Sequence, residues 1–153
     1  MGSNCCSQKQ EHNLKLEDRI KTPKLTVDCI VEYEAKIVLV KRKHPPLGWA
    51  LPGGFVEIGE TVEQAVRREL MEETNMELKD LKQFHVYSDP KRDLRFHTVS
   101  VVFTARSDME PKAGDDADDT KLFTQDEISK MNADCQICFD HGTILADYFS
   151  NTL

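Results

Sequence analysis

The sequence predicts an α/β protein, an α/β/α sandwich whose central layer is a mixed β-sheet. Three features lead to this prediction: short runs rich in Val, Ile and Leu, one amphipathic helix before the middle of the chain, and further helices near its end. The expected strands are 25–31, 36–40, 83–87, 98–105 and a short one at 121–123, and the expected late helices are 125–131 and 137–149.

The first two strands are expected to form a hairpin. A tight turn near Glu34 and Ala35 joins them. Pro45 and Pro46 then force a loop, because proline cannot donate to a strand ladder. Later in the chain, residues 109–120 are predicted to form an acidic loop before the last short strand.

The early helix is predicted to begin after Thr61. Thr61 and Gln64 have the spacing of a capping box, in which each side chain bonds the other residue's backbone N–H. Asn75 is suited to end the helix, because asparagine tolerates the left-handed conformation. Residues at helical spacing that should face the core are Val62, Ala65, Val66 and Leu70.

Length and composition favour one domain. The chain has 153 residues, and we expect a folded domain over 22–153 after a flexible polar segment at 1–21. The net charge of −7, from 20 basic and 27 acidic residues, argues against nucleic-acid and membrane-surface binding. No apolar run approaches the roughly 18 residues of a membrane span, and no secretory signal is visible. We therefore expect a soluble, cytoplasmic protein.

The amino terminus resembles that of a doubly acylated protein. Gly2 follows Met1, and Cys5 and Cys6 come close behind. The myristoylation motif has Ser or Thr where this chain has Cys6, so an unmodified polar tail is the preferred interpretation. Lipidation and a cloning remnant are the alternatives.

The cysteine pattern favours reduced thiols. Five cysteines are an odd number without the spacing of a disulfide framework. Cys135, Cys138 and His141 suggest zinc, but no second Cys or His pair completes four ligands. Helix-packing thiols are the preferred interpretation.

A cluster of acids is the most specific signal in the sequence. Glu69, Glu72 and Glu73 lie at i, i+3 and i+4, so a helix places them on one stripe. Carboxylates gathered in this way repel one another, which favours a bound cation that neutralises them. A solvated, charge-rich helix face is the alternative. The full pattern is Gly54-x5-Glu60-x7-Arg68-Glu69-Leu70-x-Glu72-Glu73-x-Asn75-Met76.

This spacing resembles the Nudix box, and the chain is similar to Nudix hydrolases over roughly residues 24–149. Asn75 stands where the box usually has glycine, which is the one departure within it. The resemblance implies the sandwich architecture described above. It also implies hydrolysis of a nucleoside diphosphate linked to another moiety, with Mg²⁺ or Mn²⁺ as the cofactor.

The resemblance implies specific roles for the acids. Glu69, Glu72 and Glu73 are the expected metal ligands, and Gly54, or the loop before it, is expected to add a backbone carbonyl. Arg68 is expected to orient a carboxylate by charge-assisted hydrogen bonds.

The identity of the general base is left open between two sources. Glu69 or Glu72 would accept the proton of the attacking water, as proposed for some relatives. In other relatives an acid of a later loop does so, and Asp116 in the 114–119 segment is placed to provide it. A merely solvated acidic loop is the alternative for that segment.

Residues beyond the box point to the substrate. Pro90 lies 15 residues after Asn75, where a subset of Nudix enzymes that cleave ADP-ribose carries a proline. Residues 88–100 look like that subset's pattern, although Leu94 replaces a second common proline. Within this stretch, the guanidinium groups at Arg92 and Arg95 are candidates for binding phosphate or ribose oxygens.

The sequence thus predicts hydrolysis of ADP-ribose to AMP and ribose 5-phosphate. One alternative is a nucleoside triphosphate pyrophosphohydrolase that removes oxidised nucleotides such as 8-oxo-dGTP. Another is a Nudix-fold sensor that binds an ADP-ribose derivative without cleaving it. The expected partner is a nucleotide-linked small molecule, with no nucleic acid and no membrane, and such enzymes are often homodimers.

Overall fold

The computed structural model describes residues 20–114 and 117–150. The proposed lipidation residues Gly2, Cys5 and Cys6, and nearly all of the expected flexible segment, lie outside the described residues. The elements of the described part are β1 (Lys24–Tyr33), β2 (Lys36–Arg42), β3 (Trp49–Ala50), β4 (Gly53–Phe55), α2 (Val62–Thr74), β5 (Lys79–Tyr87), β6 (Thr98–Arg106), β7 (Ala117–Phe123), α3 (Gln125–Ala133) and α4 (His141–Ser150).

The strands form one mixed sheet, as the sequence predicts. Its order is β3-β2-β1-β6-β5, with β4 also paired to β1 and β7 to β2. β1 and β6 are parallel, and the other pairs are antiparallel. β1 and β2 pair only next to their hairpin turn, at Glu32 with Ile37 and Tyr33 with Lys36. Beyond that point the two strands take different partners.

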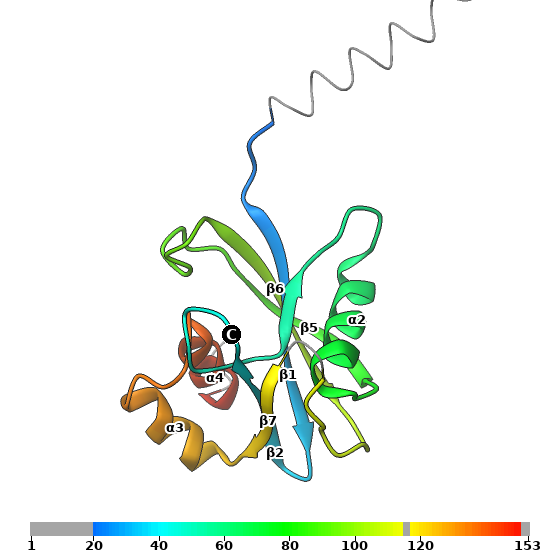
Figure 1. Ribbon diagram of the computed structural model, residues 1–153, viewed down its shortest axis with the longest axis vertical. Helices are drawn as coiled ribbons and strands as arrows, with labels where there is room; N and C mark the ends of the chain where they lie inside the picture. Colours follow the sequence, from blue (N-terminus) through cyan, green and yellow to red (C-terminus); the bar gives the residue numbers. More distant parts are fainter. Residues whose placement is uncertain (1–19, 115–116, 151–153) are drawn as a thin grey trace, which may run out of the picture.

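Helices cover both faces of the sheet, which confirms the predicted α/β/α sandwich. Figure 1 shows α2 on one side of the strands, and α3 and α4 on the other. One core cluster joins the sheet to α2 through Val27, Cys29, Val31, Ala65, Val66 and Leu70. The second joins the sheet to α3 and α4 through Ile30, Leu39, Ile128, Ile144 and Leu145. Successive residues of β1 therefore alternate between the two cores, as pleated strands require.

The two ends of α2 match the sequence prediction. Thr61 is the N-cap, and its side chain and that of Gln64 form the reciprocal capping-box bonds. Asn75 is the C-cap in the left-handed conformation, with φ of 55° and ψ of 30°. Asparagine therefore performs the conformational role of glycine at this position.

Two boundaries differ from the prediction. The last helix begins at His141 instead of 137, because Ile137 forms a bridge with Trp49 and Phe139 has a left-handed φ of 57°. The acidic segment 109–120 is a loop only in its first part. Its end joins β7, because Ala117–Phe123 pairs with β2.

The remaining elements agree with the prediction, with small extensions. Glu34 and Ala35 form the hairpin turn, with positive φ values of 48° and 60°. The strand expected at 83–87 begins earlier, at Lys79. Among the described residues, none of the helices is both long and apolar enough to cross a lipid bilayer.

The packing of α2 predicts that alanine substitutions at two adjacent apolar residues, one buried and one exposed, destabilise the protein by different amounts. Leu70 is fully buried, whereas Met71 on the same helix is 42% exposed. Leu70→Ala removes packed methyl groups and leaves a cavity, so we expect the free energy of unfolding in urea to fall by about 2–5 kcal/mol. The control, Met71→Ala, should change it by less than about 1 kcal/mol. Equal losses for both variants would contradict this packing of α2.

Candidate active site

A cleft opens where β1 and β2 diverge. Its lining comes from β1 (Thr26, Asp28), β2 (Val40, Arg42), residues of the 50–55 segment, Glu73, residues of the 92–98 turn, and the start of α4 with the residues before it (Phe139, His141). Polar and apolar side chains share the lining, and the charged ones come from several elements. Such a concave site with converging polar groups is the expected form of a ligand site.

The cleft continues into a second, apolar pocket. The first has a volume of about 210 Å³ and the second about 530 Å³. Arg92, Asp93, Arg95 and Phe139 line both. Because ligand pockets usually measure about 300–1,000 Å³, the first alone is small for a nucleotide derivative, whereas the two together are large enough.

Arg68 organises the acidic stripe of α2. Its guanidinium donates to both carboxylate oxygens of Glu60, at 2.7 and 3.1 Å, and to Oε1 of Glu69 at 2.8 Å. It also reaches Oε2 of Glu72 at 3.2 Å and the carbonyl oxygen of Phe55 at 3.1 Å. The arginine therefore connects the helix to the loop before it and fixes the carboxylates, as the sequence predicts for this residue type.

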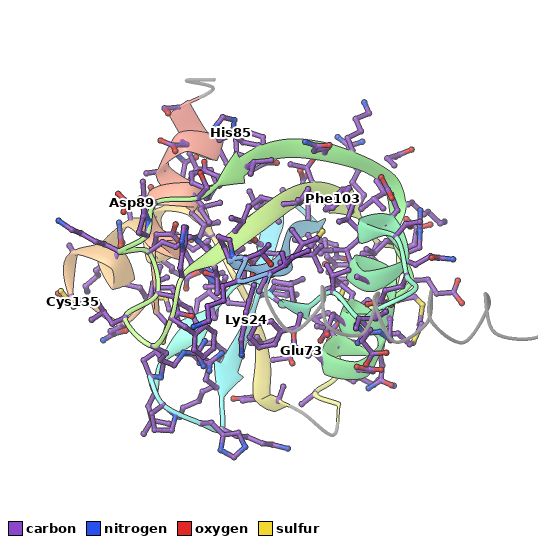
Figure 2. All side chains as sticks on the ribbon, turned by 90° about the horizontal axis from the view of Figure 1, so that it is seen from above. Lys24, Glu73, His85, Asp89, Phe103 and Cys135 are labelled. Atoms are coloured by element: carbon purple, nitrogen blue, oxygen red, sulfur yellow. The ribbon has the colours of Figure 1, made fainter. Side chains whose placement is uncertain are left out.

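The Gly53-Gly54 segment lies directly against the acids. The N–H of Gly53 donates to Oε2 of Glu73 at 2.9 Å. A Cβ atom on Gly54 would lie 2.4 Å from Cδ of Glu69, a distance that real Cβ contacts do not reach. Glycine at 54 is therefore needed for the carboxylate of Glu69 to sit where it does. Figure 2 shows Glu73 where α2 meets the sheet.

Burial makes the Glu73 carboxylate unusually basic. Its pKa is raised to about 8, chiefly by desolvation and also by the nearby charges of Glu69 and Asp28, while the Gly53 N–H and Arg42 act in the opposite direction. Desolvation also raises the pKa of Glu69, against the opposing effect of Arg68. Partly buried acids with raised pKa values in a cleft are typical of functional sites.

The donor chemistry fits a hard divalent cation. Arg68 and Gly53 occupy one oxygen of each acid, and the other oxygen (Glu69 Oε2, Glu72 Oε1, Glu73 Oε1) has no hydrogen bond within residues 20–114 and 117–150. Carboxylate oxygens are the ligands that Mg²⁺ and Mn²⁺ prefer. The described part of the chain nevertheless contains no group of three His, Cys, Asp or Glu residues already gathered around one point. A cation would therefore have to draw the acids together.

The cleft also carries guanidinium groups stacked on aromatic rings. The Arg42 and Arg95 guanidiniums lie 4.8 and 5.0 Å from the ring centroid of Phe139. Arg95 also lies 5.1 Å from the ring centroid of Phe96. Cation–π contacts therefore help to fix both arginines in the cleft lining. The lining combines these guanidinium groups with carboxylates such as Glu73 and Asp28.

The predicted substrate residues occupy different places. Arg95 lines the cleft, is 39% exposed and pairs with Asp93. The guanidinium of Arg92 is buried, donating to Asp140 at 2.8 and 2.9 Å and to Thr98 at 2.9 Å. Arg92 therefore lies in the cleft floor with these donors committed to protein partners, not as the free clamp that the sequence suggested. Pro90 is exposed in the turn after β5 and does not line the cleft.

The acidic segment is attached to the end of α2. The N–H groups of Lys112 and Gly114 donate to the carbonyl oxygens of Thr74 and Glu73, each at 2.9 Å. The side-chain amide of Asn75 donates to the carbonyl oxygen of Lys112 at 3.1 Å. The segment therefore passes beside the acidic stripe. The candidate base Asp116 lies outside the described residues.

Sequence reasoning missed the polar floor of the cleft. Asp28 accepts a hydrogen bond from Ser100 and lies 3.7 Å from Arg92 and 3.5 Å from Nε2 of His141. The one signal in the sequence was an acid inside the apolar run of residues 25–31. His141 was noticed only as a zinc candidate, because its partner Leu51 lies 90 positions away.

The described residues hold no group of three His, Cys, Asp or Glu side chains gathered for zinc. The preferred interpretation, helix-packing thiols, is wrong for Cys135, which is exposed, whereas Cys138 is buried; both lie between α3 and α4. Figure 2 shows Cys135 at the edge of the molecule beyond α3, far from Glu73. Burial raises the pKa of the Cys138 thiol, and its Sγ contacts the carbonyl oxygen of Pro46.

A family model described as the NUDIX domain matches residues 22–139, which is most of the chain. The chain belongs to the Nudix family. The acidic stripe on α2, with Arg68 and the glycine segment against it, is therefore the Nudix helix and its loop. Members of this family typically depend on a divalent metal.

Individual relatives agree with this family. The chain is 46% identical over 131 residues to the ADP-ribose pyrophosphatase of Methanocaldococcus jannaschii, an alignment that covers 82% of this chain and 73% of the relative. The NUDIX domain of Shewanella oneidensis NrtR, solved with ADP ribose, matches with a TM-score of 0.77 and 27% identity over 89% of this chain and 92% of that one.

A bifunctional NMN adenylyltransferase/ADP ribose pyrophosphatase from Francisella tularensis, solved with AMP and a manganese ion, also matches. Its TM-score is 0.73 and its identity 32%, over 94% of this chain. The chain spans 46% of the length of that protein, about half.

The Nudix helix predicts a pH-dependent stability for metal-free protein. The pKa of Glu73 is about 8 when folded, above its ordinary value of 4.5, so between these values the folded state binds more protons than the unfolded state. Stability should therefore fall as pH rises through this range. The pKa of His141 is lowered from its ordinary value of 6.5, so this histidine changes the stability mainly below that pH. It therefore does not mask the loss of stability caused by Glu73 at higher pH.

We expect urea denaturation of EDTA-treated protein to show lower stability at about pH 8 than at about pH 6.5. Glu73→Gln, which cannot ionise, should lose most of this difference. A wild-type protein that becomes more stable over the same range would contradict the desolvated state of Glu73.

Proposed function

We propose that this Nudix protein hydrolyses the pyrophosphate bond of ADP-ribose, giving AMP and ribose 5-phosphate. The observation that carries the proposal is the cleft, whose lining brings the desolvated Glu73 of the Nudix helix together with the aromatic-stacked Arg42 and Arg95. A diphosphate needs cationic groups along its oxygens, and a nucleoside needs apolar surface beyond them. The 46% identity to an ADP-ribose pyrophosphatase selects this substrate among the nucleotides that the same geometry would accept.

In this proposal the acids of the Nudix helix bind the metal ion, and Arg68 orients them. Glu69, Glu72 and Glu73 hold Mg²⁺ or Mn²⁺, with a backbone carbonyl from Gly54 or its neighbour. When bound, the cation withdraws charge from the phosphate oxygens and lowers the pKa of a coordinated water. Arg68 keeps the carboxylates oriented and prevents them from separating by mutual repulsion.

The chemical step is the addition of water oxygen to one phosphorus and the breaking of the bridging P–O bond. The proton of the water goes to a carboxylate, which we assign to Glu69 or Glu72, with Asp116 as the alternative acceptor. Glu69 is well suited, because desolvation raises its pKa. The Arg95 side chain is 39% exposed and can bind substrate oxygens, whereas the Arg92 side chain is 5% exposed and paired with Asp140 in the floor of the cleft.

Two other functions use the same fold. A triphosphate pyrophosphohydrolase would act on 8-oxo-dGTP, and a sensor would bind ADP-ribose without cleaving it. The complete set of acids at 69, 72 and 73 favours an enzyme over a sensor. The apolar pocket that continues the cleft past Arg95 and Phe139 favours a ligand that extends past its diphosphate.

A product assay decides among these functions. Purified protein with Mg²⁺ or Mn²⁺ is incubated with ADP-ribose, 8-oxo-dGTP, NADH and diadenosine polyphosphates, and the products are separated by chromatography. We expect AMP and ribose 5-phosphate from ADP-ribose at the highest kcat/KM. Preferred release of pyrophosphate from 8-oxo-dGTP would replace the proposal by the first alternative. Binding of ADP-ribose without any product would replace it by the second.

The metal-holding role of Glu73 predicts a large loss of activity on neutralisation. Glu73→Gln removes a ligand charge with little change in shape, so kcat for ADP-ribose should fall by about 100-fold or more. Glu63→Gln is the matched control, because Glu63 lies exposed in the first turn of the same helix. Near-normal kcat for Glu73→Gln would place the cation elsewhere.

The two arginines of the 92–98 turn should fail in different ways. Arg95→Lys keeps a cation beside Asp93, whose side chain is 5% exposed, but loses the planar fork, so KM for ADP-ribose should rise by about tenfold with little change in melting temperature. Arg92→Ala leaves Asp140 without its buried partner, so the free energy of unfolding should fall by about 3–5 kcal/mol. Calorimetry and steady-state kinetics on both variants test this difference. Equal changes in KM and equal losses of stability in the two variants would refute the separate roles.

A further inference from the structure

His141 is a buried histidine that the proposed reaction does not use. It begins α4 and is 4% exposed at the floor of the cleft. Its Nδ1 accepts a hydrogen bond of 2.9 Å from the backbone N–H of Leu51. The proton of the neutral ring therefore lies on Nε2, which faces Oδ1 of Asp28 at 3.5 Å. Burial lowers the pKa of His141 and so keeps the acceptor nitrogen unprotonated.

Leu51 lies between β3 and β4, where the chain stops pairing with β2 and is about to pair with β1. β3 pairs with β2 and ends at Ala50, whereas β4 pairs with β1 and begins at Gly53. Leu51 belongs to neither strand and is 2% exposed, so water cannot satisfy its N–H. A buried N–H needs a partner, and the imidazole of His141 supplies it.

The segment that Leu51 opens touches the acids of the Nudix helix. Two residues further on, the N–H of Gly53 donates to Glu73, and Gly54 leaves the space that the Glu69 carboxylate fills. In between, the carbonyl oxygen of Pro52 accepts from the N–H of Cys29 at 2.9 Å. The segment is thus held by α4 at its start, by β1 in its middle and by α2 at its end.

We propose that His141 is a positioning residue of the active site, which acts through the N–H of Leu51 to set where Gly53 and Gly54 meet Glu73 and Glu69. Asp28 completes the arrangement, because its carboxylate faces the protonated nitrogen and so maintains the tautomer that accepts from Leu51. The kinetic consequence rests on the proposed hydrolase function, whereas the structural link does not.

Two substitutions at His141 separate the acceptor from the rest of the side chain. In His141→Asn, Oδ1 is bonded to Cγ as Nδ1 is in histidine, so the acceptor for Leu51 is kept. In His141→Ala it is lost. We expect kcat for ADP-ribose with Mg²⁺ to fall by about 10- to 100-fold in His141→Ala, with KM nearly unchanged, because the reacting groups are misplaced while the substrate contacts remain. His141→Asn should stay close to the wild-type kcat.

Leu78→Ala is the control for loss of stability. Leu78 is 8% exposed in the core on the α2 side of the sheet and takes no part in the cleft. It should lower the melting temperature without lowering kcat of the folded protein. Amide hydrogen exchange measured by NMR reports the link directly. The N–H of Leu51 should be protected in the wild type and in His141→Asn, and exchange faster in His141→Ala.

An unchanged kcat in folded His141→Ala would overturn the proposal, and so would an Asn variant as slow as the Ala variant. If the wild type hydrolyses none of the nucleotides, the proposed function fails. The role of His141 is then tested by measuring Mn²⁺ affinity instead of kcat. Weaker Mn²⁺ binding by His141→Ala than by His141→Asn would then support the positioning role. Equal binding by the two variants would exclude it.

Discussion

The structure depends on how a few half-buried carboxylates are compensated. Glu69 and Glu73 lie on one face of α2, where burial makes their charges costly, and the charge of Asp28 on β1 also acts on Glu73. Arg68 and the N–H of Gly53 offset part of this cost within the protein. Protonation offsets the remainder in the metal-free protein, and in the proposed function a bound divalent cation does so.

The divergence of β1 and β2 provides the space in which this chemistry takes place. After the hairpin, β4 takes the place beside β1, and β3 and β7 take the places beside β2. The segment 51–54 crosses between these partners and brings backbone against the carboxylates. The 92–98 turn and the start of α4 close the cleft from the other face of the sheet. The Nudix helix and α4 thus lie on different faces of the sheet, and both contact the 51–54 segment.

Arg92 and Arg95 illustrate how burial divides residues that look alike in sequence. Both follow Pro90 within a few positions, and both were candidates for substrate binding. The Arg92 guanidinium is buried and donates two hydrogen bonds to Asp140, so it forms part of the cleft floor. Arg95 pairs with the adjacent Asp93 and stacks on two aromatic rings, and its side chain stays 39% exposed in the cleft. The partner that separates them comes from 48 positions away.

The sequence by itself determined what depends on local spacing: the capped helix of residues 62–74 with its acidic stripe, the hairpin at 34–35 and the alternating strands. These features rest on interactions between residues a few positions apart, which the order of residues states directly. Only the tertiary structure decided that Glu73 is desolvated, that Arg92 is buried and that His141 holds Leu51. Each of these depends on partners that folding brings together across layers, and on the exclusion of water that follows.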